Sequence, residues 1–179
     1  ELNKAGARII AVDKATGELL WTTKIETHPA AVITQSAIAH EGIAYVGVSS
    51  WEEYIASKVP GYECCSFRGS LAALEVATGE LIWQTHVVPD APGYSGNAVW
   101  GGMPAIDAAR GMVYITTGNT YAVPESLRAC VAAARRQRSA EAEAACLAAE
   151  PVNYVDAFVA LDLKTGEIAW GMPALPYDP

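Results

Sequence analysis

One eleven-residue pattern occurs three times in the sequence. It reads AVDKATGELLW at 11–21, ALEVATGELIW at 73–83 and ALDLKTGEIAW at 160–170. Each copy has an alternating strand that ends at Asp or Glu, a turn whose Gly takes a positive φ, and a second strand that ends in Trp. The pattern therefore predicts three β-hairpins, each with a Trp large enough to fill the gap between neighbouring sheets.

A second type of hairpin alternates with the first. It reads SAIAHEGIAYVGVSS at 36–50 and PAIDAARGMVYITTGN at 104–119. Pairing the two types gives four-stranded units over 31–87 and 98–171, with half a unit at 7–23. Such units are typical of β-propeller blades. The alternative is a β-sandwich with coincidentally similar hairpins, and three copies of one pattern argue against it.

About two and a half blades cannot close a ring, because a propeller needs about four to eight. We therefore expect an internal fragment of a larger propeller. The chain begins ELNKAGARII, without the apolar stretch of a signal peptide, and its end, GMPALPYDP, stops within a connection.

Composition excludes several classes of partner. The 179 residues are 51% hydrophobic and 18% charged, with a net charge of −8, which argues for a globular chain and against binding to nucleic acid or anionic membranes. No apolar run approaches the roughly 18 residues of a membrane span.

The adjacent cysteines Cys64 and Cys65 allow three interpretations: buried thiols, half of a metal site, or a vicinal disulfide. The sequence has no Cys-x-x-Cys pair, and its three histidines are scattered singly, so a zinc site is disfavoured. We favour the vicinal disulfide, which suits an oxidising compartment.

The segment 124–151 differs in composition from the rest of the chain. It is rich in Ala, Glu, Arg and Leu, which are strong helix formers, and it predicts a helical hairpin inserted into the blade. Cys130 and Cys146 would face each other on its two helices. We expect them to form a disulfide in an oxidising compartment, with free buried thiols as the alternative.

The blade pattern and the loop residues together resemble the pyrroloquinoline quinone (PQQ) dehydrogenases, over essentially the whole chain. The resemblance implies an all-β, eight-bladed propeller that oxidises alcohols in the periplasm. The SSWEE segment, the CCSFRGS insertion and the Ala-rich helical segment look most like the polyvinyl alcohol dehydrogenase-like members.

The resemblance also assigns residues on the first full blade. The segment VGVSSWEE matches a family segment that contacts the quinone and ligates calcium, so Ser49 and Ser50 are predicted to contact the quinone and Glu52 to bind the metal. Glu53 is the alternative ligand if the register shifts by one. In TQSA, Thr34 matches a threonine that contacts the quinone.

The second full blade supplies two further matches. Trp100 in AVWGG corresponds to the tryptophan on which the quinone stacks, and Asn119 in VYITTGN corresponds to an asparagine that ligates calcium. Calcium prefers oxygen ligands and a planar quinone needs an aromatic floor, so these types suit the chemistry. Taken singly, Trp100 could fill a gap between blades, Glu52 could be a solvated charge, and Asn119 could be a turn residue.

The resemblance leaves the role of Cys64–Cys65 open. Related enzymes place a ring of adjacent cysteines over the quinone, but there the pair precedes the calcium-binding glutamate. Here it follows Glu52 by twelve residues. The pair is therefore predicted either to contact the quinone or to brace the insertion.

The family's catalytic aspartate would lie just beyond residue 179, so Asp156 and Asp178 are poor candidates for the base. The implied reaction passes hydride from an alcohol, secondary or polymeric, to the quinone, with calcium as Lewis acid and a c-type cytochrome as electron acceptor. The alternative function is a non-catalytic propeller scaffold that binds proteins in the cell envelope.

Overall fold

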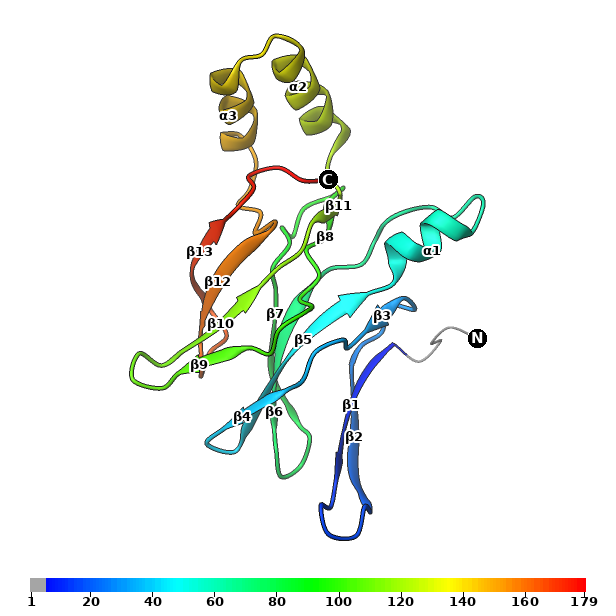
Figure 1. Ribbon diagram of the computed structural model, residues 1–179, viewed down its shortest axis with the longest axis vertical. Helices are drawn as coiled ribbons and strands as arrows, with labels where there is room; N and C mark the ends of the chain where they lie inside the picture. The colour runs from blue at the N-terminus through cyan, green and yellow to red at the C-terminus, as the bar shows by residue number, and fades with distance from the viewer. Residues whose placement is uncertain (1–5) are drawn as a thin grey trace.

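The computed structural model describes residues 6–179 and shows a chain built mainly of antiparallel β-strands (Figure 1). The first sheet pairs β1 (Ala7–Val12) with β2 (Leu19–Glu26). The second contains β4 (Ile38–His40), β5 (Ile43–Ser50), β6 (Ser70–Glu75) and β7 (Leu81–His86), and β3 (Ala31–Val32) pairs with the end of β5. The expectation of a mainly β fold is confirmed.

A third sheet follows the same order. It contains β9 (Ala105–Asp107), β10 (Met112–Thr116), β12 (Ala157–Asp162) and β13 (Ile168–Pro173). Two short strands, β8 (Ser95–Gly96) and β11 (Thr120–Ala122), pair with each other beside it. The four-stranded sheets thus combine one hairpin of each type that the sequence predicted.

Local hydrogen bonds explain the Asp-x-x-Thr-Gly-Glu turn. The carboxylate of Asp13 accepts from the backbone N–H groups of Ala15 and Thr16, each at 2.8 Å, and Asp162 accepts equally from Lys164 and Thr165. The glycine that follows has a φ of +75° in the first copy and +72° in the third. Glycine is required there because other residues adopt this region only with strain.

The tryptophan of each of the first two hairpins packs on the turn of the next. The Nε1–H of Trp21 donates to the carbonyl of Val76 (2.9 Å), and that of Trp83 donates to the carbonyl of Leu163 (3.3 Å). Two residues after each tryptophan, a threonine hydroxyl donates to the carbonyl of the turn glycine, at 2.6 Å and 2.7 Å. The repeat therefore encodes the contact between sheets as well as the hairpin.

The core lies between successive sheets. Tyr45 and Leu71 pack against Val113 and Leu161 of the third sheet, and the Tyr45 hydroxyl donates to the carbonyl of Leu163. On the other face of β5, Val46 packs with residues of the first sheet. Because β5 is covered on both faces, its sequence is almost continuously apolar.

The helices lie in two insertions. Helix α1 (Glu52–Lys58) follows β5 directly, and the pair α2 (Glu125–Arg136) and α3 (Ala140–Ala148) lies within the predicted insertion 124–151. Ser139 caps α3 by accepting from the N–H of Ala142 (3.1 Å), and the predicted disulfide Cys130–Cys146 joins the two helices.

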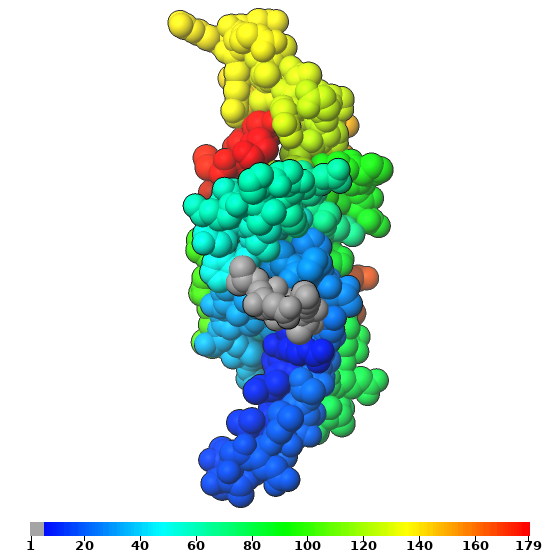
Figure 2. Space-filling model, turned by 90° about the vertical axis from the view of Figure 1, so that its right-hand side faces the viewer, coloured from blue at the N-terminus to red at the C-terminus, as the bar shows by residue number. Residues whose placement is uncertain are grey.

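The molecule is elongated (Figure 2). The helical pair protrudes at one end and the tip of the β1–β2 hairpin lies at the other (Figure 1). Within residues 6–179, none of the helices has the length and apolarity that a membrane span requires.

We predict that Gly166→Ala destabilises the protein more than Gly42→Ala. Both glycines have a positive φ, but a Cβ at Gly166 would lie 2.6 Å from the Trp83 ring, whereas a Cβ at Gly42 would have no atom within 4 Å. The free energy of unfolding should fall by about 1–2 kcal/mol for Gly42→Ala and by about 1–3 kcal/mol more for Gly166→Ala. Denaturant unfolding of both variants measures this, and equal losses would contradict the packing role.

Candidate functional site

A pocket of about 400 Å³ lies at the ends of β5 and β11, and we call it the Trp100 pocket. Five of its residues are those that the sequence predicted for the quinone and the metal: Thr34, Ser49, Ser50, Trp100 and Asn119. The others are Trp51, Glu53, Gly101 and Tyr121. Residues from the segments around the second and third sheets therefore meet in one cavity of the size that small-molecule sites commonly have.

Trp100 lies on the connection between β8 and β9 and is 57% exposed. The flanking backbone is fixed, because the N–H of Val99 donates to Val48 of β5 (3.0 Å) and the carbonyl of Ala98 accepts from Gly118 (2.9 Å). A Cβ at Gly118 would lie 2.5 Å from Trp100 Nε1, so the missing side chain makes room for the indole. The ring is thus held in place while it stays accessible, as an aromatic floor requires.

Asn119 and Glu53 contact each other across the pocket. The Nδ2–H of Asn119 donates to Glu53 Oε1 at 3.0 Å, which joins the start of α1 to the segment after β10. Tyr121 lies two residues after Asn119, on the same side of the extended strand, and it lines the same pocket. Burial, followed by the charges of Glu53 and Glu52, raises the pKa of Tyr121, so its hydroxyl stays protonated.

Glu52, which the resemblance assigned to the metal together with Asn119, does not line the Trp100 pocket. Its side chain is fully buried on the other side of α1 and accepts hydrogen bonds from the segment 62–67. Successive residues of a helix point about 100° apart, so only one of two adjacent carboxylates can face a given cavity. Here that residue is Glu53, the alternative ligand if the register of the family match shifts by one residue.

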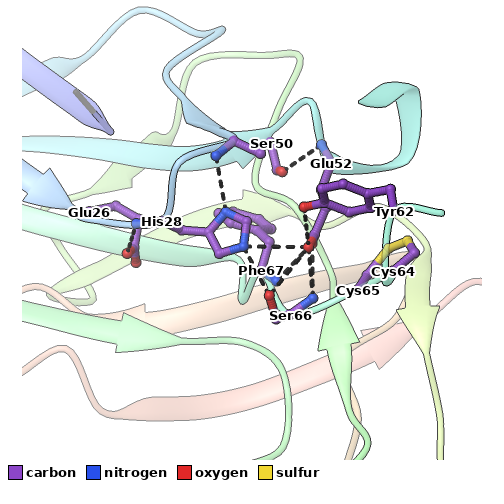
Figure 3. A network of polar contacts seen from close by, with 10 residues as sticks. Glu26, His28, Ser50, Glu52, Tyr62, Cys64, Cys65, Ser66 and Phe67 are labelled. Carbon is purple, nitrogen blue, oxygen red and sulfur yellow. Dashed lines mark hydrogen bonds and ion pairs between the residues drawn. A yellow bond between two sulfur atoms is a disulfide. The ribbon is translucent and has the colours of Figure 1, made fainter. Parts of the chain in front are cut away.

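Cys64 and Cys65 form the vicinal disulfide that the sequence favoured. They lie beside Tyr62 and Ser66, next to Glu52 (Figure 3), and they are not among the residues that line the Trp100 pocket. Within residues 6–179, this placement favours the interpretation that the cysteine pair braces the insertion over the interpretation that it contacts the quinone.

Three residues or contacts of the site were missed by sequence reasoning. Trp51 lines the pocket, and no role was predicted for it. Tyr121 could have been found from its spacing, because residues two apart on a strand share a side. The contact of His28 with Glu52, in which Nε2 lies 3.4 Å from Oε1, has no local signal in the sequence.

The donor types of the Trp100 pocket fit a metal of the calcium type. Glu53 provides a carboxylate and Asn119 an amide oxygen, and both are hard oxygen donors. Among residues 6–179 there is no group of three or more His, Cys, Asp or Glu side chains that could hold a metal ion by itself. A metal held here would therefore need further oxygens from the cofactor or from other parts of the protein.

Asp156 and Asp178 lie close together but away from the Trp100 pocket. The N–H of Thr120 donates to the carbonyl of Asp178 (2.9 Å), and Ala174 donates to the carbonyl of Asp156 (2.8 Å). Burial and the adjacent Asp178 raise the pKa of Asp156. Neither carboxylate lines the pocket.

Comparison with known proteins places this architecture in a family. The PQQ_2 family profile, described as outer membrane protein assembly factor BamB, matches residues 2–172. The chain therefore belongs to the PQQ_2 family. The same fold occurs in the quinohemoprotein alcohol dehydrogenases ADHIIG of Pseudomonas putida HK5 (TM-score 0.65, 21% identity) and of Comamonas testosteroni (TM-score 0.62, 23% identity). Each comparison covers 94% of this chain, and 24% and 25% of the solved chains respectively.

A narrower similarity points to one kind of relative. Over 73 residues the chain is 42% identical to a polyvinylalcohol dehydrogenase of Sphingopyxis sp. (strain 113P3). The match covers 41% of this chain and 11% of that relative, so only a small part of the relative's length is represented. The predicted resemblance to PQQ-dependent alcohol dehydrogenases and their polyvinyl alcohol dehydrogenase-like members is confirmed.

We predict that Asp156→Asn stabilises the protein more at pH 7 than at pH 3. A carboxyl whose pKa is raised on folding stabilises the fold fully below its unfolded pKa, and that contribution is lost as pH rises through the folded pKa. Any benefit of Asn at this positive-φ position is the same at both pH values. The gain in the free energy of unfolding of the variant over wild type should therefore be about 0.5 kcal/mol larger at pH 7 than at pH 3. A difference independent of pH would contradict the pKa shift.

Proposed function

We propose that this chain forms part of a PQQ- and calcium-dependent dehydrogenase that oxidises alcohols. The observation that carries the proposal is the convergence of Glu53, Trp100 and Asn119 with three predicted hydroxyl residues in one pocket. The names of the relatives support the class, and the repeat supports a larger propeller built from blades such as 31–87 and 98–171. The family resemblance implies that this propeller has eight blades. The chain by itself would then be inactive.

Each residue of the pocket has a role in this proposal. The Trp100 indole would bind one face of the planar cofactor, and the hydroxyls of Thr34, Ser49 and Ser50 would donate to its carboxylates. Glu53 and Asn119 would hold the metal, with Glu53 in the role first assigned to Glu52. When bound, the quinone would act as the oxidant and the metal as a Lewis acid.

The base that takes the alcohol proton is proposed to lie just beyond residue 179. The backbone contact between Asp178 and Thr120 supports this, because it brings the C-terminal residues beside the strand that follows Asn119. Neither Asp156 nor Asp178 reaches the pocket from its own position.

Substrate, acceptor and location are part of the same proposal. The similarity to a polyvinylalcohol dehydrogenase supports secondary alcohols, including polymeric ones, as substrates. Electrons would pass to a c-type cytochrome. Two disulfides, Cys64–Cys65 and Cys130–Cys146, support the oxidising periplasm as the location.

A non-catalytic scaffold is the second candidate, because the matching family profile is described as an outer membrane assembly factor. A scaffold has no chemical need for an accessible tryptophan beside a carboxylate and an amide. The deciding experiment reconstitutes the full-length protein with PQQ and Ca²⁺ and measures reduction of an artificial dye with secondary alcohols. Absence of both a bound-quinone spectrum and turnover would overturn the enzyme proposal.

We expect Glu53→Gln to weaken Ca²⁺ binding by about 100-fold or more in the PQQ-loaded protein, because removing a direct ligand should exceed the roughly 10–100-fold effect of outer-shell changes. Calorimetric titration with Ca²⁺ measures this. The exposed Glu63 provides the matched control, since Glu63→Gln removes the same charge outside the pocket. Equal affinities for the two variants would exclude Glu53 as a ligand.

We expect Gly118→Ala to weaken PQQ binding by about tenfold, because the added methyl must displace the Trp100 indole. Gly102→Ala is the control, since a Cβ there meets nothing within 4 Å. Titration with PQQ at saturating Ca²⁺, followed by quenching of tryptophan fluorescence, gives both affinities. An unchanged affinity in Gly118→Ala would contradict the role of Trp100 as the floor.

A further inference from the structure

The carboxylate of Glu52 is buried in a dense set of hydrogen-bond donors. The backbone N–H groups of Ser66 and Phe67 donate to its Oε1 and Oε2 at 2.9 Å and 2.8 Å, and the Tyr62 hydroxyl donates to Oε1 at 3.0 Å. The side chain has no exposed surface. Burial of a carboxylate is costly without such partners, so this arrangement holds only while residues 62–67, which we call the cysteine loop, stay in place.

His28 closes the network from a third segment of the chain (Figure 3). The N–H of Ala30 donates to His28 Nδ1 (3.2 Å), which assigns the ring proton to Nε2. Nε2 in turn lies 3.1 Å from the Ser66 hydroxyl and 3.4 Å from Glu52 Oε1. Glu52 therefore joins the connection after β2, the first turn of α1 and the cysteine loop.

The cysteine loop is held at two points, the Glu52 carboxylate and the buried Phe67 side chain. The disulfide Cys64–Cys65 lies between Tyr62 and Ser66, and both of these flanking residues donate to the same carboxylate. Phe67 is fully buried and leads directly into β6. The loop is thus fixed to the core at one end and to α1 through Glu52.

Glu52 also precedes the residue that faces the Trp100 pocket. Glu53 is exposed, and in the pocket it accepts a hydrogen bond from Asn119. Glu52 fixes the backbone at the start of α1, because its N–H donates to the Ser50 hydroxyl (2.9 Å) and its side chain is fully buried. The direction of Glu53 therefore depends on the anchoring of its neighbour.

We infer that Glu52 is a positioning residue, which fixes Glu53 in the Trp100 pocket and holds the cysteine loop against α1. The inference rests on the proposed function for the metal-binding role of Glu53. The anchoring of the loop is independent of that role, because it follows from contacts in the cofactor-free protein. A carboxylate that touches neither cofactor nor substrate would in this way control a ligand of the metal.

The test compares Glu52→Gln with Glu63→Gln in the full-length protein. Gln turns an amide N–H₂ toward backbone donors, so Glu52→Gln should weaken Ca²⁺ binding to the PQQ-loaded protein by about 10–100-fold. It should also speed reduction of Cys64–Cys65 by dithiothreitol in the cofactor-free protein by about tenfold, followed by alkylation and mass spectrometry. Glu63→Gln, in the same loop, should change neither.

A milder variant keeps the test decisive if Glu52→Gln does not fold. Tyr62→Phe removes one donor and leaves the carboxylate and its backbone partners, so it should give smaller changes in the same direction in both measurements. If Ca²⁺ does not bind to the wild type with PQQ, the proposed function fails, and the reduction rates still test the anchoring. If Glu53→Gln loses Ca²⁺ while Glu52→Gln and Tyr62→Phe match the wild type in both measurements, the inference is overturned.

Discussion

The arrangement of the protein depends on one repeated contact, in which a tryptophan of one hairpin packs against the turn glycine of the next. Trp21 meets Gly79 and Trp83 meets Gly166, and each indole N–H donates to a backbone carbonyl of the neighbouring hairpin. Because the contact combines a large apolar surface with a directed hydrogen bond, it fixes both the distance and the angle between sheets. The ends of β5 and β11 are thereby brought to the two sides of a common pocket.

The pocket residues share a pattern of support. Glu53 follows the buried Glu52, and Asn119 precedes the buried Thr120. Thr120 belongs to a closed set of hydrogen bonds with Asn97 and Asn153, in which its hydroxyl donates to Asn97 (2.8 Å) and accepts from Asn153 (3.0 Å). An accessible side chain next to an anchored residue has a defined direction without being buried itself, which would suit the proposed cofactor site.

Much of the fold and of the site could be predicted from the sequence. The hairpins follow from local turn chemistry, and the family resemblance singled out Trp100 and Asn119, which the structure places in one cavity. The cysteine pair was correctly favoured as a disulfide, but its position relative to the cavity could not be predicted. An insertion has no repeat to fix its path, so its contacts depend on residues such as His28, far away in the sequence.

The sequence by itself determined the hairpins and their stacking, because the Asp-x-x-Thr-Gly turn and the tryptophan act through contacts that each copy carries within itself or presents to the next copy. Only the tertiary structure decided which of the adjacent carboxylates Glu52 and Glu53 faces the pocket. Both are chemically able to bind a metal, and a shift of one residue exchanges them. The choice was made by the N–H groups of Ser66 and Phe67, which bind the Glu52 carboxylate and leave Glu53 to the pocket.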